Sequence, residues 1–388
     1  MGEQRTIRIA QSCAAEPRVA AEELYRGLEQ PDLSLVLFFC SSAYDREALA
    51  GELRARFGRA PIVGCTTAGE IGPLGCRDGS LTGVSFAPSA GRAVIGHLDR
   101  LREFDRREGV AFARRLRRRL DDEAPQADAH NTFAFLLVDG LFGHEEQLAA
   151  ALQEGIGDVP LVGGSAGDSM SFAGTYVYRD GEFVSDAAAV VLVTTPLPFM
   201  EFKTQHFEPT DERLVVTEAD PAERVVSEIN GLPAAEEYAR MLGVDPRDLG
   251  PAHFAASPVV VLIDGGHYVR SIQKVNADGG LKFYCAIERG VVLRVARGVD
   301  LVRNLETAFA QVRARIGRPQ VVLTFDCILR KLEIAQTGVE HAVADVLRAN
   351  NAVGFNTYGE QYCGVHMNQT LTAVAIGSRR AAGGNLGG

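Results

Sequence analysis

Short apolar runs alternate along this chain with segments in which apolar residues recur at helical spacing. Alternating polarity over Thr6 to Gln11 predicts a strand, and the continuous apolar run Leu33 to Phe39 predicts a buried one. Asp45 to Phe57 has the spacing of a helix that buries one face. A second apolar strand begins at Pro61, breaks in a glycine-rich turn, and is followed by a third strand over Leu81 to Phe86.

This order of elements recurs along the chain. Ser34 to Gly64 aligns without gaps with Phe133 to Gly163, and Pro61 to Phe86 aligns without gaps with Asn351 to Ile376. The first alignment is identical at Leu37, Glu47, Leu49, Ala50, Leu53, Gly58, Pro61, Val63 and Gly64. The second is identical at Val63, Gly64, Thr67, Gly69, Glu70, Leu81, Thr82 and Val84. With the third copy over 320–377, the sequence predicts an α/β fold of duplicated strand–helix–strand modules that form mixed sheets with packed helices.

The pattern changes between the second and the third copy. We predict helical ends for Glu218 to Leu242, a helix over Leu301 to Ile316, and strands over Pro258 to Asp264, Tyr268 to Ile272 and Gly290 to Val295. We therefore predict an N-terminal domain over 31–198, which holds two copies, and a C-terminal domain over 199–378, with a disordered tail over 379–388. Ligand pockets are common between domains, so we expect the site where these halves meet.

The composition of the chain limits the classes of partner and the cellular location that we expect. The formal net charge of −10 disfavours nucleic acid, and the basic stretch Arg114 to Arg119 is interpreted as a solvated helix face. No apolar run approaches the roughly 20 residues that a membrane helix needs, and the first residues do not resemble a secretion signal. Seven cysteines, an odd number spread along the chain, are typical of a reduced compartment. We expect a cytoplasmic protein without a membrane span, and dimerisation is left open.

Histidines are the first candidates for chemistry. Six of the eight lie singly in strands, loops or helix faces and are expected to be surface or satisfied core groups. His206 stands between an amide and an aromatic residue, and His366 lies in the polar connection of the third glycine turn. A neutral imidazole beside apolar side chains is what an axial haem ligand requires, so both residues are candidate cofactor ligands.

Thiols and carboxylates give weaker signals. Cys65, Cys285, Cys327 and Cys363 could act as nucleophiles or hold an iron–sulfur cluster, although their spacing is not that of a ferredoxin. Acidic residues recur at the glycine turns of all copies, which favours a structural cap over catalysis; they are Glu70, Asp168 and Glu360. The turns lack the Lys-Ser or Lys-Thr of a P-loop, so nucleotide binding is not expected.

Several motifs in order resemble a known family. They are GCTTAGE (64–70), NGLPAAEEYARMLG (230–243), GFNTYGE (354–360) and HMNQT (366–370). Together they are similar to the FIST domain proteins, bacterial signal-input proteins with a FIST N and a FIST C half. The segments 203–239 and 325–333 resemble, more narrowly, the nitric-oxide-sensing NosP branch of that family.

The resemblance implies a function. Members of that branch bind haem b, sense nitric oxide and regulate a histidine kinase, and through it biofilm formation and cyclic-di-GMP signalling; they are not enzymes. In the wider family the position of His206 is commonly a glycine, so the imidazole here is implied to be the iron ligand, with His366 as the other candidate. A small organic ligand such as an amino acid, bound without haem near the glycine turns, is the alternative. A thiol- or carboxylate-based enzyme is the third interpretation.

Overall fold

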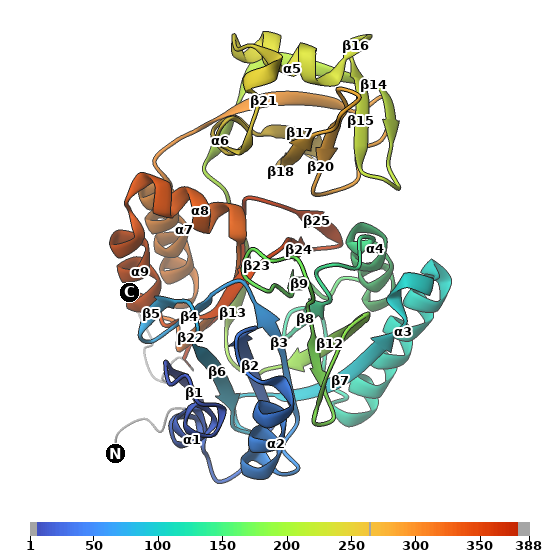
Figure 1. Cartoon of the computed structure of the whole chain (residues 1–388). Coiled ribbons are helices and arrows are strands. Elements are labelled where there is room, and N and C mark those ends of the chain that lie inside the picture. The colour runs from blue at the N-terminus through green and yellow to red at the C-terminus, as the bar shows by residue number, and fades with distance from the viewer. Residues whose placement is uncertain (1–5, 264, 379–388) are drawn as a thin grey trace, which may run out of the picture.

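The computed structural model describes residues 6–263 and 265–378, and the predicted tail over 379–388 lies outside them. In these residues, three six-stranded mixed sheets with helices on their outer faces form one unit, which we call the body. A separate eight-stranded sheet lies above the body in the view of Figure 1. The α/β prediction of repeated modules with mixed sheets and packed helices is confirmed.

Each module runs from an edge strand through a helix to a parallel strand pair and a hairpin. Module 1 comprises β1 (Ile7–Ser12), α1 (Pro17–Leu28), β2 (Leu35–Ser41), α2 (Arg46–Phe57), β3 (Ile62–Thr67), β4 (Glu70–Gly72), β5 (Gly75–Arg77) and β6 (Leu81–Phe86). Module 2 comprises β7 (Arg92–Asp99), η1 (Leu101–Glu103), α3 (Arg106–Glu123), β8 (Thr132–Val138), α4 (Glu145–Ile156), β9 (Leu161–Ser165), β10 (Val177–Arg179), β11 (Glu182–Val184) and β12 (Ala187–Thr194). Module 3 comprises β13 (Phe199–Thr204), α7 (Leu301–Ile316), β22 (Val321–Cys327), α8 (Ile328–Thr337), α9 (Glu340–Ala349), β23 (Ala352–Thr357), β24 (Glu360–Tyr362), β25 (Val365–Met367) and β26 (Leu371–Ile376).

The modules exchange their hairpins in a closed cycle. The sheet orders are β1-β6-β2-β3-β10-β11, β7-β12-β8-β9-β24-β25 and β13-β26-β22-β23-β4-β5. Each sheet therefore ends in a hairpin from another module: module 1 donates to module 3, module 3 to module 2, and module 2 to module 1. This ring arrangement has pseudo-threefold character, which follows from the sequence duplication.

The inner faces of the three sheets share one core. It takes Phe39 from β2, Phe135 from β8, and Phe325 and Phe355 from β22 and β23. Ring centroids of Phe39 and Phe355 lie 4.8 Å apart, and those of Phe325 and Phe355 lie 5.6 Å apart. Full burial of one such side chain stabilises the fold by about 1.5–3 kcal/mol, so this shared core joins the modules into one body.

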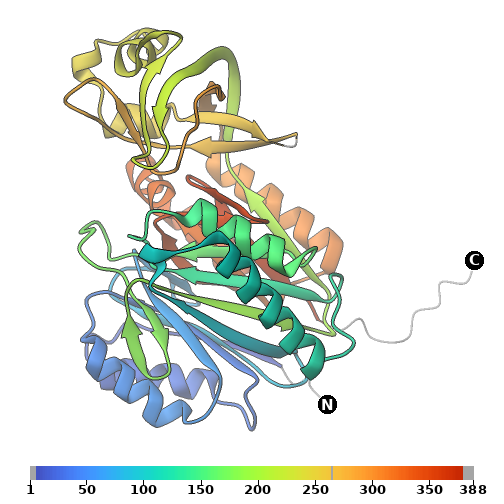
Figure 2. The ribbon, with the colours of Figure 1, turned by 90° about the vertical axis from the view of Figure 1, so that its right-hand side faces the viewer.

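Between β13 and α7 the chain leaves the body and forms the insert, residues 207–298. The insert contains β14 (Phe207–Asp220), β15 (Val225–Ile229), β16 (Leu232–Pro233), α5 (Ala234–Leu242), η2 (Pro246–Asp248), α6 (Pro251–Ala256), β17 (Val259–Ile263), β18 (Gly266–Arg270), β19 (Ile272–Val275), β20 (Leu281–Phe283) and β21 (Val292–Gly298). Figure 2 shows the insert as a unit above the body, joined to it by two neighbouring chain segments. The division of the chain at residue 198 stays a prediction.

The elements predicted from periodicity have mixed outcomes. The helix over Leu301 to Ile316 is confirmed, with Asp300 as its N-cap, since its carboxylate accepts the amide of Arg303. Helical character near the start of Glu218 to Leu242 was wrong, because Val225–Ile229 forms β15 between β14 and β20 and only Ala234–Leu242 is helical. No helix in the described ranges is long and apolar enough to cross a membrane.

Candidate functional site

The carboxyl ends of the parallel strand pairs meet the donated hairpins, and this creates three related junctions. At each junction a hairpin strand packs on a helix of the receiving module: β5 on α9, β11 on α2 and β25 on α4. Ligands of α/β proteins bind at the carboxyl ends of parallel strands, so the polar groups buried there are the first candidates for a site.

His206 lies where the chain passes from the body into the insert. Its carbonyl accepts the amide of Val299 (2.7 Å), which lies in the returning segment, so the two connections of the insert are hydrogen-bonded to each other. The imidazole is fully buried, with its Nε2 2.6 Å from Oε1 of Glu333 and its Nδ1 3.2 Å from Nη1 of Arg330. These contacts fix the ring between the insert and helix α8.

The hydrogen bonds also fix the proton on this ring. A guanidinium can only donate, so Nδ1 of His206 accepts from Arg330, and Nε2 carries the proton that it donates to Glu333. Neither nitrogen is free to bind iron in this arrangement. Haem ligation by His206 stays a prediction, and it requires the Glu333 hydrogen bond to open.

His366 lies on β25, at the junction with α4. Its Nδ1 is 3.1 Å from the side-chain amide of Gln361, and its carbonyl accepts a hydrogen bond from Arg270 of the insert (3.1 Å). Burial lowers the pKa of this imidazole, although Glu146 and Glu145 act in the opposite direction, so the ring is neutral.

Buried amides beside His366 have unused hydrogen-bonding capacity. Both polar atoms of Asn368 and Oε1 of Gln361 are buried and have no hydrogen-bond partner among the residues that the structure describes. Rotation of the Gln361 amide by half a turn would let its oxygen accept a proton on Nδ1 of His366, which would free Nε2 as a ligand. Ligating histidines in proteins have a partner of this kind on their second nitrogen, so His366 fits an axial role more readily than His206 does.

The cysteines are not gathered into a cluster. Cys65 and Cys327 are buried in separate strands, where burial raises the pKa of both thiols, and Cys363 is exposed. Within the described residues no three or more His, Cys, Asp or Glu side chains are arranged to hold a metal ion. The described residues therefore offer no group of cysteines that supports the iron–sulfur hypothesis.

Two of the recurring carboxylates have the same contacts in their two modules. Glu70 contacts Thr67 through one oxygen and accepts from the amide and hydroxyl of Ser80 through the other (2.9 and 2.8 Å). Glu360 contacts Thr357 and, through its other oxygen, the amide and hydroxyl of Thr370 (3.3 and 2.7 Å). These are the contacts of a structural cap that ties each hairpin to its own module.

The surroundings of the three recurring carboxylates shift their pKa values. Burial raises the pKa of Glu70 to about 7 and that of Glu360 to about 8, against the lowering effect of their hydroxyl donors. Asp168 differs, because burial is outweighed by the hydroxyl of Tyr358 and the amides of residues 172–174, so its pKa is lowered.

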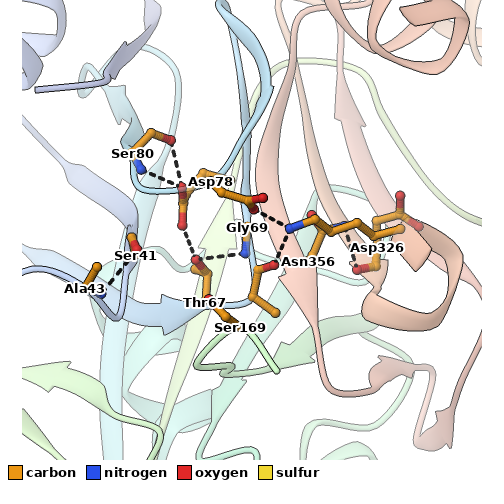
Figure 3. Close-up of polar contacts among 12 residues, drawn as sticks. Ser41, Ala43, Thr67, Gly69, Asp78, Ser80, Ser169, Asp326 and Asn356 are labelled. Carbon is orange, nitrogen blue, oxygen red and sulfur yellow. Dashed lines mark hydrogen bonds and ion pairs between the residues drawn. The ribbon is translucent and has the colours of Figure 1, made fainter. Parts of the chain in front are cut away.

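The junction between β5 and α9 contains a pocket of about 250 Å³, which is lined by both charged and apolar side chains. Lys331 of α8 spans it: the ammonium contacts Asp78 and donates to the carbonyl of Ala68 (2.8 Å). Asp326 and Asn356, near the ends of β22 and β23, also line it (Figure 3), as do Arg77 and Glu340. Sequence reasoning missed these residues, because Asp78 and Lys331 lie far apart in the chain and only the exchanged hairpin brings them together.

Comparison with known proteins identifies the family. The FIST N domain model matches residues 34–232, and the FIST C domain model matches residues 234–363. This chain belongs to the FIST family. FIST domains are sensor domains of signal transduction rather than catalytic domains.

A relative is found among the archaea. The chain is 26% identical over 227 residues to an uncharacterized protein of Methanocaldococcus jannaschii, MJ1623. The match covers 57% of this chain and 43% of that protein, so the chain spans less than half of the relative's length.

Proposed function

We propose that this FIST protein is a cytoplasmic signal input that binds haem b, responds to nitric oxide and regulates a partner histidine kinase in biofilm and cyclic-di-GMP signalling. The narrow sequence resemblance over residues 203–239 and 325–333 supports the nitric oxide branch. The observation that carries the proposal is that both candidate histidines lie at the boundary between the body and the insert. His206 lies in the connection between them, and the carbonyl of His366 accepts a hydrogen bond from Arg270 of the insert.

The boundary between the body and the insert is suited to transmit a conformational change. Ferrous haem supplies an iron with an open position that nitric oxide can occupy. On the protein side, His206 holds its proton on Nε2 against Glu333, and His366 is held neutral by burial. A ligand biases two conformations only by its different affinity for them, so the signal is a change in how the insert rests on the body.

The visible spectrum of the purified protein titrated with haem tests this proposal. We expect a saturable Soret band that shifts with nitric oxide, and loss of that band in either His206→Ala or His366→Ala identifies the ligand. Because His206→Ala also removes a hydrogen bond to Glu333, circular dichroism of each variant is needed to show that it is folded. A wild-type protein without a saturable band would overturn the haem proposal.

A small organic ligand such as an amino acid is a second candidate, favoured by the pocket at the β5–α9 junction. Lys331 can pair with a carboxylate, whereas Asp78 and Glu340, which also line the pocket, can receive an ammonium group. We expect an amino acid ligand to raise the melting temperature of the haem-free protein, and Lys331→Gln to abolish that rise. A screen of the common amino acids without any shift would rule this candidate out.

A further inference from the structure

A groove of about 800 Å³ lies between the open face of the insert sheet and helix α4 of the body. The wall that the insert supplies is formed by β14, β17, β18 and β21, and Glu146 lines the groove from α4. Neither of the two predicted ligands, His206 and His366, lines this groove, and the resemblance to the FIST family gives it no role.

The floor of the groove is apolar and open to solvent. Leu262 is 62% exposed and Val292 is 45% exposed, although both lie within strands of a folded sheet. Val292 pairs directly with Val215 of β14, which is 38% exposed. Large apolar side chains that form a row on a sheet face are typical of a surface that another molecule covers.

Three arginines lie next to this apolar row. Arg213 and Arg294 are directly opposite each other on β14 and β21, an arrangement that destabilises a sheet when both residues carry the same charge. Arg270, which also lines the groove, donates to the carbonyls of Val269 and His366. Within the described residues none of the three forms an ion pair with a carboxylate, so their charges are available to an anion.

We infer that this groove binds a molecule with an apolar body and a carboxylate. The apolar body lies on Leu262 and Val292, and the carboxylate lies between Arg213 and Arg294. Two acidic residues also line the groove. Glu146 is paired with Arg224 (2.9 Å) and accepts the amide of Ala286 (2.8 Å), and Glu288 lies in an exposed loop.

Haem, with two carboxylates on a flat apolar ring, belongs to this class, as does a fatty acid. For haem the inference deepens the proposed function and rests on it. His267 lies directly across from Leu262 on the neighbouring strand and lines the groove, so it supplies an imidazole at this site. For a fatty acid the inference stands without haem.

The experiment measures binding of two probes, dodecanoate by calorimetry and haemin by its Soret band. We expect Arg213→Gln combined with Arg294→Gln to weaken both by at least about tenfold, because each removes a charged hydrogen-bond donor. Leu262→Asp should abolish binding of both probes. Arg297→Gln, a change on the same strand β21 outside the groove, is the matched control and should leave both affinities unchanged.

The outcomes separate this inference from the proposed function. If haemin binding and dodecanoate binding both survive the double arginine variant, and haemin binding is lost in His206→Ala, the groove inference is overturned and the haem sensor is kept. Dodecanoate binding that depends on the arginines, without any haemin binding, would keep the groove and overturn the haem sensor. If neither probe binds the wild-type protein, the groove inference is wrong. Loss of the Soret band in His267→Ala, with dodecanoate binding retained, would place the iron in the groove.

Discussion

Arg330 donates its Nε–H to Oδ1 of Asp326 across 2.7 Å, and the two side chains are 0% and 3% exposed. The same guanidinium donates to His206, so one buried ion pair supports both the third module and the connection to the insert. Asp326 also lines the pocket at the β5–α9 junction, which makes Arg330 a link between the two candidate regions.

Loss of Arg330 is expected to be costly. Arg330→Ala leaves the carboxylate of Asp326 buried and unpaired, and this should lower the free energy of unfolding by about 3–5 kcal/mol. Urea unfolding followed by circular dichroism measures the loss. Arg348→Ala removes an exposed ion pair with Asp345 and should change stability by less than about 1 kcal/mol. Equal effects of the two variants would contradict the structural role of the buried pair.

Stability should fall as the pH rises through neutrality. The pKa of Glu360 is about 8 in the folded protein and about 4.5 in the unfolded chain, so the folded protein keeps a proton that the unfolded chain has released. The contribution of Glu360 to the free energy of unfolding is complete below pH 4.5 and is lost as the pH rises through 8. This free energy falls by at most about 1.4 kcal/mol per pH unit.

Urea unfolding at pH 5, 6.5 and 8.5 checks this dependence. Glu360→Gln, which cannot ionise, should unfold with a visibly flatter dependence on pH than the wild type. Glu208→Gln, an exposed change in β14, should retain the wild-type dependence. A wild-type protein whose stability is constant over this range would show that Glu360 is already ionised at pH 5.

Two glycines should respond in opposite directions to the same substitution. A Cβ at Gly354 would lie 1.7 Å from the carbonyl oxygen of Thr324 on the neighbouring strand, so Gly354→Ala must force β22 and β23 apart. A Cβ at Gly51, inside helix α2, meets nothing within 4 Å, so Gly51→Ala should stabilise the protein by about 0.5–1 kcal/mol. The two melting temperatures, compared with that of the wild type, test this contrast.

The insert is held on the body by Arg224. Its guanidinium donates to Glu145 (2.5 Å) and Glu146 (2.9 Å) of α4 and to the carbonyl of Tyr284. Arg224→Ala should therefore increase hydrogen exchange at residues 284–287 and leave the central strands of the body protected, as mass spectrometry can follow. Lys282→Ala, a neighbouring change within the insert, is the control and should leave the exchange at these residues unchanged.

The repeated modules could be predicted because their signals are local. The helix over Leu301–Ile316 has an N-cap at Asp300, a glycine at 317 and a regular apolar face, and all of these lie next to one another in the sequence. The strand Val225–Ile229 was missed because its two valines and isoleucine have no clear alternation, and its place between β14 and β20 is decided by pairing.

The candidate sites depended on contacts that no local pattern contains. His206 and His366 could be selected by their chemistry, but the partners that determine their protons, Glu333 and Gln361, follow only from the fold. The opposed arginines of the groove, Arg213 and Arg294, are 81 positions apart by number and meet only through strand register. The selection of His206 and His366 as ligands therefore stays a prediction, and no spacing in the sequence indicates that Arg213 and Arg294 meet.

The exchange of hairpins also limits how this protein can be divided. A fragment over residues 34–232, the extent of the FIST N match, would keep β10 and β11 on β3 but would leave β9 without β24 and β4 without β23. Unpaired strand edges are templates for association with another chain. The two named halves are therefore units of descent rather than units of folding, and the body must close as a whole before any one of its sheets is complete.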